Sequence, residues 1–332
     1  MSCCAVRPPA PRRTQSGMSL VELMIALAIG LFLLAGAISV FGKTRDLYRT
    51  NEAAARLQES ARYAMSTIEA DLRMANYYGL NSRPDLINNA AEPGETLDAT
   101  IAPYAATIGA CGDNWGVDLT SYVDGDNNGY ALDCAAFSAA TTATDVLTIR
   151  RASTESIAVA TLPATDGQLK IQTSRVQGTL FGDDEIPGGY LPPLSESRAL
   201  VVHSYYVDQD STRQAGLPSL RRKALGFDAA ANSPTIVDEE ITEGIEDLQF
   251  EIGVDTNADQ NADYYTQPDT VLGAGDGIVS VRVWLLARAE LPELGFVDDR
   301  DYLYADRPLY QPADAFRRLL VTKTIQLRNT RR

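Results

Sequence analysis

Residues 18–41 read MSLVELMIALAIGLFLLAGAISVF, and this stretch decides how the rest of the chain is interpreted. It contains one charged residue, Glu22, and no proline. At a rise of about 1.5 Å per residue, a helix of this length is about 36 Å long, which is enough to cross the hydrocarbon core of a bilayer. The stretch therefore predicts a membrane-spanning helix.

The composition of the whole chain differs from that of this stretch. The 332 residues include 44 Asp and Glu against 29 Lys and Arg, a formal net charge of −15, and a single His, His203. A mean hydropathy of −0.15 excludes a polytopic membrane protein. The acidic excess argues against a broad phosphate-binding surface, and one His excludes His-rich zinc sites. The rest of the chain is therefore expected to be an acidic globular body.

Two ordinary interpretations of the apolar stretch leave a feature unexplained. A secretory signal peptide could be cut at Ala-Gly-Ala, residues 35–37, but residues 38–41 stay apolar beyond that site. A plain single-pass anchor is the second interpretation, and the nearly equal basic charge on its two sides does not fix its orientation. Neither explains Glu22, because a carboxylate inside an apolar span is costly and usually has a partner.

A third interpretation accounts for Glu22. Gly17 followed by Met18, with a Glu four residues further on, resembles the class III signal of type IV pilins and pseudopilins. The resemblance implies that a prepilin peptidase removes residues 1–17 as a leader and methylates Met18. It also implies that Glu22 pairs with the N-terminal amine of a neighbouring subunit. Residues 18–41 would first anchor the chain in the bacterial inner membrane and later pack in a filament core.

Beyond the apolar stretch the helical period continues. Apolar side chains recur on one face of an amphipathic helix through residues 42–79: Leu47, Ala54, Leu57, Ala61, Ala64, Ile68, Leu72 and Ala75. Glu69 and Arg73 form an i,i+4 pair, and Gly79 is placed to close the helix. The pattern predicts one helix over 18–78 whose second half packs on a sheet.

Further motifs narrow the resemblance to PilW-type minor pilins. Their "LQE-x-AR-x-A…DLR-x-A…G" run is similar to LQESARYA at 57–64, DLRMA at 71–75 and Gly79. Later segments that resemble the same family are residues 243–255, 279–288 and 326–329. The resemblance implies an α+β, pilin-like lollipop: a long N-terminal helix, transmembrane in its first half, packed on a C-terminal antiparallel β-sheet domain.

The remaining sequence predicts a loop-rich insertion and then a β-rich domain. Residues 80–143 are irregular and rich in Pro, Gly, Asn and Asp, which is typical of loops. Residues 144–332 contain alternating apolar runs without helical patterns between them, which favours an antiparallel sheet. The predicted strands are 145–150, 157–162, 169–173, 199–207, 245–254, 278–289 and 319–327.

Two cysteines, Cys111 and Cys134, lie in the insertion. Cys3 and Cys4 belong to the leader, so the mature chain keeps two thiols. Two cysteines in an exported domain most often form a disulfide, and two free buried thiols are the alternative. Closing a loop of 24 residues would contribute about 3.4 kcal/mol to stability.

Two clusters of oxygen-bearing side chains resemble calcium loops. The first has such a residue at every second position: Asp255, Asn257, Asp259, Asn261 and Asp263. The second and weaker cluster is Asp124, Asp126 and Asn128. Alternate oxygen side chains can turn inward around Ca²⁺, but the first cluster lacks the turn glycine and the final acid of an EF-hand. Solvated turns are the alternative for both, and no other cofactor is expected.

No catalytic set is recognised, and the chain is not expected to be an enzyme. Ser204 adjoins His203, but neighbours in a strand point to opposite faces and make a poor nucleophile–base pair. The basic groups at 221–223 and 317–318, with Lys323, are expected to be solvated faces or subunit contacts. Nucleic acid is not an expected partner, because the chain as a whole is strongly acidic.

The family resemblance also implies a function. It implies a structural subunit that helps prime type IV pilus assembly and sits at or near the pilus tip with other minor pilins. The implied partners are those minor pilins, the major pilin, a tip adhesin, the prepilin peptidase and the inner-membrane assembly platform. The globular domain would be periplasmic before assembly and at the cell surface afterwards. The alternatives are a type II secretion pseudopilin and an unprocessed, membrane-anchored adhesive or binding protein.

Overall fold

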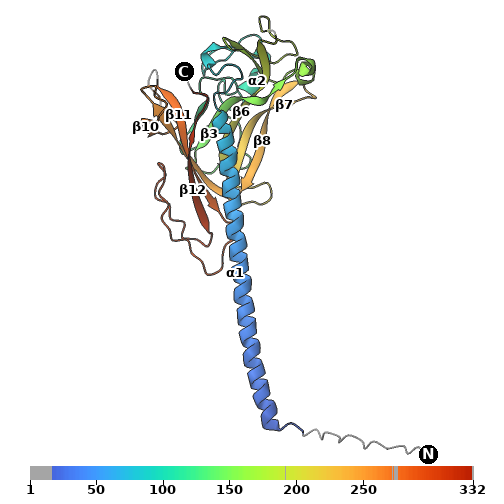
Figure 1. Cartoon of the computed structure of the whole chain (residues 1–332), viewed down its shortest axis with the longest axis vertical. Coiled ribbons are helices and arrows are strands. Elements are labelled where there is room, and N and C mark those ends of the chain that lie inside the picture. The colour runs from blue at the N-terminus through green and yellow to red at the C-terminus, as the bar shows by residue number, and fades with distance from the viewer. Residues whose placement is uncertain (1–16, 191, 271, 273–275, 331–332) are drawn as a thin grey trace, which may run out of the picture. The chain divides into compact units, whose positions relative to one another are not determined.

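The computed structural model describes residues 17–190, 192–270, 272 and 276–330. The predicted leader, apart from its last residue Gly17, lies outside the described residues. The chain divides into two compact units (Figure 1). The N-terminal unit extends to Glu52, and the globular unit begins at Ala53. Each is described by itself.

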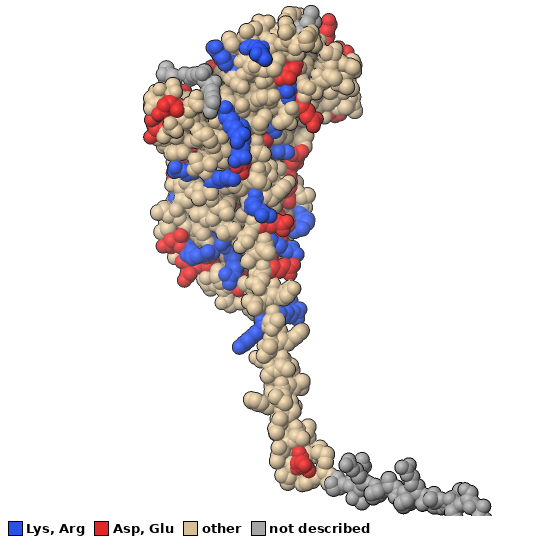
Figure 2. Space-filling view, in the orientation of Figure 1, with Lys and Arg blue, Asp and Glu red and all other residues tan. Residues whose placement is uncertain are grey.

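The N-terminal unit contains the first part of helix α1 (Leu20–Met74). Every side chain of residues 18–41 is exposed, and Glu22 carries the single charge. Figure 2 shows this part of the helix as a nearly uninterrupted uncharged surface. Among the described residues, α1 is the one helix long and apolar enough to cross a membrane, judged by length and composition. The predicted membrane-spanning segment is therefore helical.

The globular unit is built from two sheets and short helices. Its strands are β1 (Ile87–Asn88), β2 (Val123–Asp126), β3 (Val146–Ile157), β4 (Lys170–Ser174), β5 (Gly178–Phe181), β6 (Ser195–Asp208), β7 (Ser219–Asp228), β8 (Ser233–Glu243), β9 (Ile245–Asp255), β10 (Tyr264–Thr266), β11 (Gly277–Arg288) and β12 (Arg318–Gln326). The short helices are η1 (Pro84–Leu86), η2 (Ala102–Tyr104), α2 (Ala105–Ile108) and η3 (Val159–Thr165).

The larger sheet is organised around β6. Its strands follow the order β1-β5-β4-β6-β3-β2, and β7 and β8 extend from β6 as a branch. The start of β6 pairs with β4 and its end pairs with β7, while β3 pairs along the opposite edge. The smaller sheet has the order β10-β9-β11-β12. All of these pairs are antiparallel except β1 with β5.

Helix α1 packs on both sheets through the predicted apolar face from Leu57 onward, whereas Leu47 of that face is 61% exposed. Its buried residues are Leu57, Ala61, Ala64, Met65, Ile68, Asp71 and Leu72. The apolar residues among them share one core with Tyr205 of the larger sheet and with Phe250 and Val283 of the smaller sheet. Each fully buried Leu, Ile or Phe contributes about 1.5–3 kcal/mol relative to exposure. The predicted α+β fold, a long helix packed on an antiparallel sheet domain, is confirmed.

The end of α1 differs from the prediction. The helix ends at Met74 rather than at residue 78. Asn76, with φ of 60°, turns the chain out of the helix, and its backbone N–H donates to the carbonyl of Arg150. Asparagine tolerates this left-handed conformation better than other non-glycine residues, so it takes the role predicted for Gly79. Gly79, with φ of 96°, adopts a later turn that brings it against Thr173.

Two strand predictions also need correction. Residues 157–162 are not a strand, because β3 ends at Ile157 and the 3₁₀-helix η3 follows. Pro163 in that helix has no N–H to donate to a sheet. Strands β7 and β8 were not predicted, although they form one of the longest pairs in the larger sheet. The insertion is also more ordered than predicted, since β1 and β2 join the larger sheet.

Candidate functional site

The N-terminal end of α1 carries the residues predicted to direct processing and assembly. Gly17 and Met18 precede the helix, and Glu22 lies in its first turn. The partial positive charge of a helix N-terminus favours a carboxylate there. Among the described residues, no basic side chain forms an ion pair with Glu22. Its exposed carboxylate is therefore accessible to a positive group of another molecule.

A buried polar cluster attaches α1 to the larger sheet. Its centre is Asp71, which is 5% exposed on the sheet-facing side of the helix. Arg151 of β3 donates to Asp71 Oδ1 from Nε at 3.1 Å and from Nη2 at 2.8 Å. His203 of β6 donates from Nδ1 to Asp71 Oδ2 at 2.6 Å, and the hydroxyl of Tyr205 donates to the same oxygen. The carboxylate of Asp71 on α1 therefore accepts hydrogen bonds from side chains of two strands, β3 and β6.

The electrostatics of this cluster keep Asp71 ionised. Burial opposes ionisation, but the hydrogen bonds from His203 and Tyr205 and the charge of Arg151 hold the pKa of Asp71 well below its usual value. Burial also lowers the pKa of His203, and the nearby Arg222 and Arg151 act in the same direction. A neutral imidazole donating to a carboxylate fits these directions. His203 therefore has a structural role as a hydrogen-bond donor to the helix.

His203 and Ser204 point to opposite faces of β6, as predicted. The Ser204 hydroxyl accepts a hydrogen bond from the indole N–H of Trp115 at 2.9 Å. It also lies 2.7 Å from the hydroxyl of Thr148. His203 instead contacts Asp71 on the helix side. The two residues do not form a nucleophile–base pair.

Residues late in the chain fasten the end of the same helix. Asn329 Nδ2 donates to the carbonyl oxygens of Ala75 and Arg73, at 3.2 and 3.4 Å. Asn76 Nδ2 donates back to the carbonyl of Asn329 at 2.9 Å. The last carbonyls of a helix have no partner inside it, so Asn329 acts as a cap supplied from a distant segment. The predicted Glu69–Arg73 pair is also present, at 2.6 Å.

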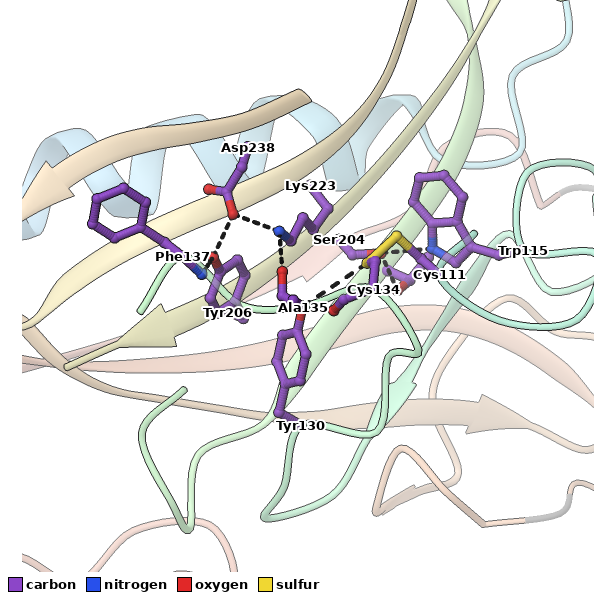
Figure 3. The surroundings of a disulfide bond; sticks show 11 residues. Cys111, Trp115, Tyr130, Cys134, Ala135, Phe137, Ser204, Tyr206, Lys223 and Asp238 are labelled. Carbon is purple, nitrogen blue, oxygen red and sulfur yellow. Dashed lines mark hydrogen bonds and ion pairs between the residues drawn. A yellow bond between two sulfur atoms is a disulfide. The ribbon is translucent and has the colours of Figure 1, made fainter. Parts of the chain in front are cut away.

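The predicted disulfide is present. Cys111 and Cys134 are bonded, and Figure 3 shows the bridge beside strands of the larger sheet. The Tyr130 hydroxyl donates to the carbonyl of Cys134 at 2.7 Å. Lys223 of β7 donates from Nζ to the carbonyl of Ala135 and to Asp238, both at 2.5 Å. The bridge and these bonds fix the second half of the insertion against β7 and β8.

Three of the basic residues are buried, contrary to the expectation of solvated faces or subunit contacts, whereas Lys323 is exposed. Arg221 and Lys223 are 3% and 6% exposed, and both form ion pairs with Asp238 of β8. Arg318 is 4% exposed and forms ion pairs with Glu246 and with an acid of the preceding connection. These side chains hold strands together within the globular unit.

The first predicted calcium cluster forms a turn after β9. Asp255 accepts hydrogen bonds from the backbone N–H groups of Asn257, Ala258 and Gln260. Asp263 accepts bonds from the N–H and hydroxyl of Thr256. A bound ion would have to share these oxygens. The described residues contain no group of three or more His, Cys, Asp or Glu side chains arranged to hold a metal.

The second predicted cluster lies at β2 and the turn that follows it. Asp124 Oδ1 accepts the N–H of Gly125, and Asp126 Oδ2 accepts the N–H of Ala131 at 3.2 Å. The side chain of Asn128 instead donates to Asp306, at 2.8 Å. Asn128 is thus turned toward a different segment of the chain. Calcium at either cluster stays a prediction.

Calcium binding is testable by thermal unfolding. If the 255–263 loop holds Ca²⁺, calcium at 100 times its dissociation constant is expected to add about 2.7 kcal/mol to the stability of the full chain. Asp259→Ala should remove this gain, and Asp184→Ala, at an exposed acid elsewhere, should retain it. A melting temperature that responds to neither calcium nor chelator identifies the loop as a plain turn.

A buried acid near the junction of the two sheets gives the stability a pH dependence. Asp145 is fully buried and accepts the N–H groups of Asn128 and Phe250, at 2.9 and 2.8 Å. Burial outweighs these bonds, and with the charges of Asp306 and Asp247 it raises the pKa of Asp145 to about 7. The folded protein therefore keeps a proton on Asp145 over a range in which the unfolded chain has released it.

The sign of the pH effect follows from this difference. Stability is expected to fall by about 1.4 kcal/mol between pH 6 and pH 8, because the folded state must release the proton in that range. Asp145→Asn does not titrate, so its stability should change less over the same range. Thermal unfolding of both proteins at pH 6, 7 and 8 measures the difference. Identical pH profiles for the two proteins would contradict the assignment.

Comparisons with known proteins agree with the sequence motifs. Residues 204–329 match the family model described as type IV pilus-assembly protein W, PilW. Residues 12–38 match the prokaryotic N-terminal methylation motif. The pilin-like protein PilA3 of Thermus thermophilus is 38% identical over 66 residues, which cover 20% of this chain. The matched region spans 28% of the length of that relative. No solved structure gives a significant match.

Three features together are those of a type IV pilin-like protein: the exposed apolar helix, its methylation motif, and the sheet domain on which the second half of α1 packs. The PilW match over residues 204–329 and the methylation motif together support a type IV pilus minor pilin similar to PilW.

Proposed function

We propose that this chain is a structural subunit that helps prime type IV pilus assembly and sits at or near the pilus tip with other minor pilins. Prepilin peptidase cuts between Gly17 and Met18 and methylates Met18. Before assembly, the subunit is anchored in the bacterial inner membrane with its globular unit in the periplasm. It then joins the filament together with the major pilin and a tip adhesin, through the inner-membrane assembly platform. No catalytic activity is proposed.

The observation that carries the proposal is the N-terminal part of α1. Its side chains over residues 18–41 are all exposed to the surroundings, although they are almost entirely apolar. Such a surface is stable in a bilayer or in a bundle of similar helices and unfavourable in water. Glu22 adds a single charge that a neighbouring N-terminal amine can neutralise. Both stages of the proposed pathway are supported by this one segment.

The first test is the mass of the native N-terminus. The chain purified from a strain with active prepilin peptidase should begin at a methylated Met18. In a strain without the peptidase the chain should keep residues 1–17. A chain that still carries the leader in the active strain would favour the unprocessed membrane-anchored protein. The sheared pilus fraction then distinguishes a pilin from a type II secretion pseudopilin, because the pilin copurifies with pili.

A second test concerns Glu22. Glu22→Ala is expected to reduce the amount of the chain in sheared pili at least tenfold, while the amount in the membrane stays the same. The physical reason is the loss of about 1.4 kcal/mol or more of pairing energy inside an apolar bundle, since a tenfold change in an equilibrium corresponds to that value. Glu59→Ala, at an exposed acid on the same helix, is the matched control. Normal incorporation of Glu22→Ala would rule out the proposed ion pair.

A further inference from the structure

The connection between β11 and β12 forms a hairpin of its own, residues 289–317, called here the C-terminal hairpin. Its two arms are joined by backbone hydrogen bonds from Ala289 to Arg317 and from Asp298 to Asp314, at 2.8 and 2.7 Å. Two more such bonds, at 2.9 and 3.1 Å, link Tyr302 with Tyr310. In Figure 1 it is the brown-red segment between β11 and β12. The connection is therefore an ordered element.

The inner face of the C-terminal hairpin is fixed to the smaller sheet. Tyr302 and Tyr304 are each 6% exposed and pack with Leu286 of β11. The Tyr304 hydroxyl donates to Asp247 of β9, and Arg307 forms an ion pair with the same carboxylate. Buried ion pairs and aromatic packing of this kind hold an element in one position.

The solvent-exposed side of the same hairpin, called here its outer face, includes several large apolar side chains. Five of them are more than half exposed: Leu291 at 70%, Leu294 at 103%, Val297 at 61%, Leu303 at 74% and Leu309 at 62%. Single exposed leucines are ordinary, but a group of this size on one element is typical of an interaction surface. A hairpin fixed by one face and apolar on the other has the properties of a docking surface.

The charge of the C-terminal hairpin indicates what kind of partner it accepts. Residues 289–317 contain seven Asp and Glu and three Arg, a net charge of −4. All three arginines form ion pairs with acids of this chain. Asp299 and Asp301 are exposed beside the apolar side chains, and neither has a basic partner among the described residues. This charge disfavours an anionic lipid surface and favours a partner that combines apolar and basic side chains.

Residues 43–49 of α1, called here the stem, combine apolar and basic side chains. Within residues 43–49, Leu47 is 61% and Tyr48 is 76% exposed. The same stretch carries three bases, Lys43, Arg45 and Arg49, and one acid. It begins two residues beyond the apolar stretch, so in an assembled filament the stem of a neighbouring subunit leaves the helix core at this level. Two different patches that complement each other make a head-to-tail contact, which extends into a filament when its rotation does not close into a ring.

We infer that the outer face of the C-terminal hairpin docks on the basic stem of the N-terminal helix of an adjacent pilin-class subunit, with Leu294 and Leu303 as apolar anchors and Asp299 and Asp301 facing its bases. The inference rests on the proposed function, because it requires neighbouring pilin-class subunits. It adds a contact between a globular unit and a neighbour's stem to the helix packing already proposed.

Photo-crosslinking in assembled pili tests the contact. A photo-crosslinking amino acid is placed at position 294 of the full chain, and mass spectrometry identifies the linked peptide. The control places it at position 176, where Val176 is 72% exposed in the turn between β4 and β5. Position 294 is expected to link to the stem of another subunit, just beyond its apolar segment, and position 176 is expected not to. Links only to lipid, only to the same chain or to non-pilin proteins would overturn the inference.

A double variant provides an independent measurement. Leu294→Asp with Leu303→Asp is expected to lower the amount of the chain in sheared pili at least tenfold, with cleavage at Gly17 and the melting temperature unchanged. Val176→Asp should have no effect. Full retention of the double variant in pili overturns the inference and leaves the proposed function intact. If the chain without these substitutions is not processed, or is absent from pili, the proposed function itself fails.

Discussion

Asp71→Ala is expected to destabilise the globular unit by about 3–5 kcal/mol, because it leaves buried positive and polar groups without their partner. Arg151 loses both of its hydrogen bonds to Asp71 Oδ1, and His203 and Tyr205 lose their shared acceptor. The cost is larger than that of a surface ion pair, since Asp71 and its partners lie between α1 and the larger sheet. The measurement is urea unfolding of the full chain in detergent.

Two controls separate the carboxylate from other effects of the change. Glu59→Ala removes an exposed acid of the same helix and should change stability by less than about 0.5 kcal/mol. Asp71→Asn keeps the size of the side chain and loses its charge, so an intermediate loss is expected. A loss below about 1 kcal/mol for Asp71→Ala would mean that the ion pairs only balance the cost of burying them.

The pH dependence of this contribution has a definite sign. The folded pKa of Asp71 is held below its unfolded value, so its contribution is present above the ordinary pKa of an aspartate and is lost only in strongly acidic solution. Asp145 acts in the opposite direction and near neutral pH. Acid unfolding therefore reports on Asp71, and stability between pH 6 and pH 8 reports on Asp145.

Removal of the disulfide is expected to cost about 3.4 kcal/mol, because the unfolded chain regains the freedom of the loop between its two cysteines. Replacing Cys111 and Cys134 together with serine avoids leaving an unpaired thiol. The insertion keeps its bonds to Lys223 and to the Tyr206 hydroxyl, shown in Figure 3, so we expect a folded but less stable protein. Thermal unfolding compares the double variant with the oxidised wild type.

Reduction supplies the matched control for the disulfide. Wild-type protein treated with a thiol reductant should melt at the temperature of the double variant, and the double variant should not respond to the reductant. An oxidised wild type that reacts with thiol reagents under native conditions would contradict the bridge. Equal melting temperatures for the oxidised and reduced forms would show that the insertion is held by its hydrogen bonds alone.

The parts of the fold that could be predicted from sequence are those that a local pattern determines. The apolar face of α1 repeats with the helical period, and its residues Leu57, Ile68 and Leu72 are buried as expected. Strands β9 and β11 alternate apolar and other residues and were also predicted. Both patterns depend only on which side chains face one core.

Strands β7 and β8 could not be predicted because their stabilising residues look like surface residues. Arg221, Arg222 and Lys223 form a basic run that reads as a solvated face. In the fold, Asp238 neutralises two of these side chains and Glu239 pairs with Arg222. No local pattern in either strand shows that the other strand carries the opposite charges.

The polar cluster at Asp71 illustrates the same limit for the candidate site. The family resemblance includes the residues around Asp71, but the partners of Asp71, Arg151 and His203, are 80 and 132 residues away.

For the C-terminal hairpin, one signal was present in the sequence: Tyr302 and Tyr304 alternate, as inward-facing residues of a strand do. It could have indicated the C-terminal hairpin, whose inner face these tyrosines form.

The cap that Asn329 places on α1 means that the globular unit cannot complete its folding until the chain has been synthesised through residue 329. Asn329 bonds to carbonyls 254 and 256 positions earlier, and Ile325 and Leu327 lie in the same core as Leu57. A chain that stops before β12 leaves that core open and the end of the helix without its partner. The first helix and the last strand of the globular unit therefore close one core together, and a chain truncated before β12 is expected to lack a stably folded globular unit.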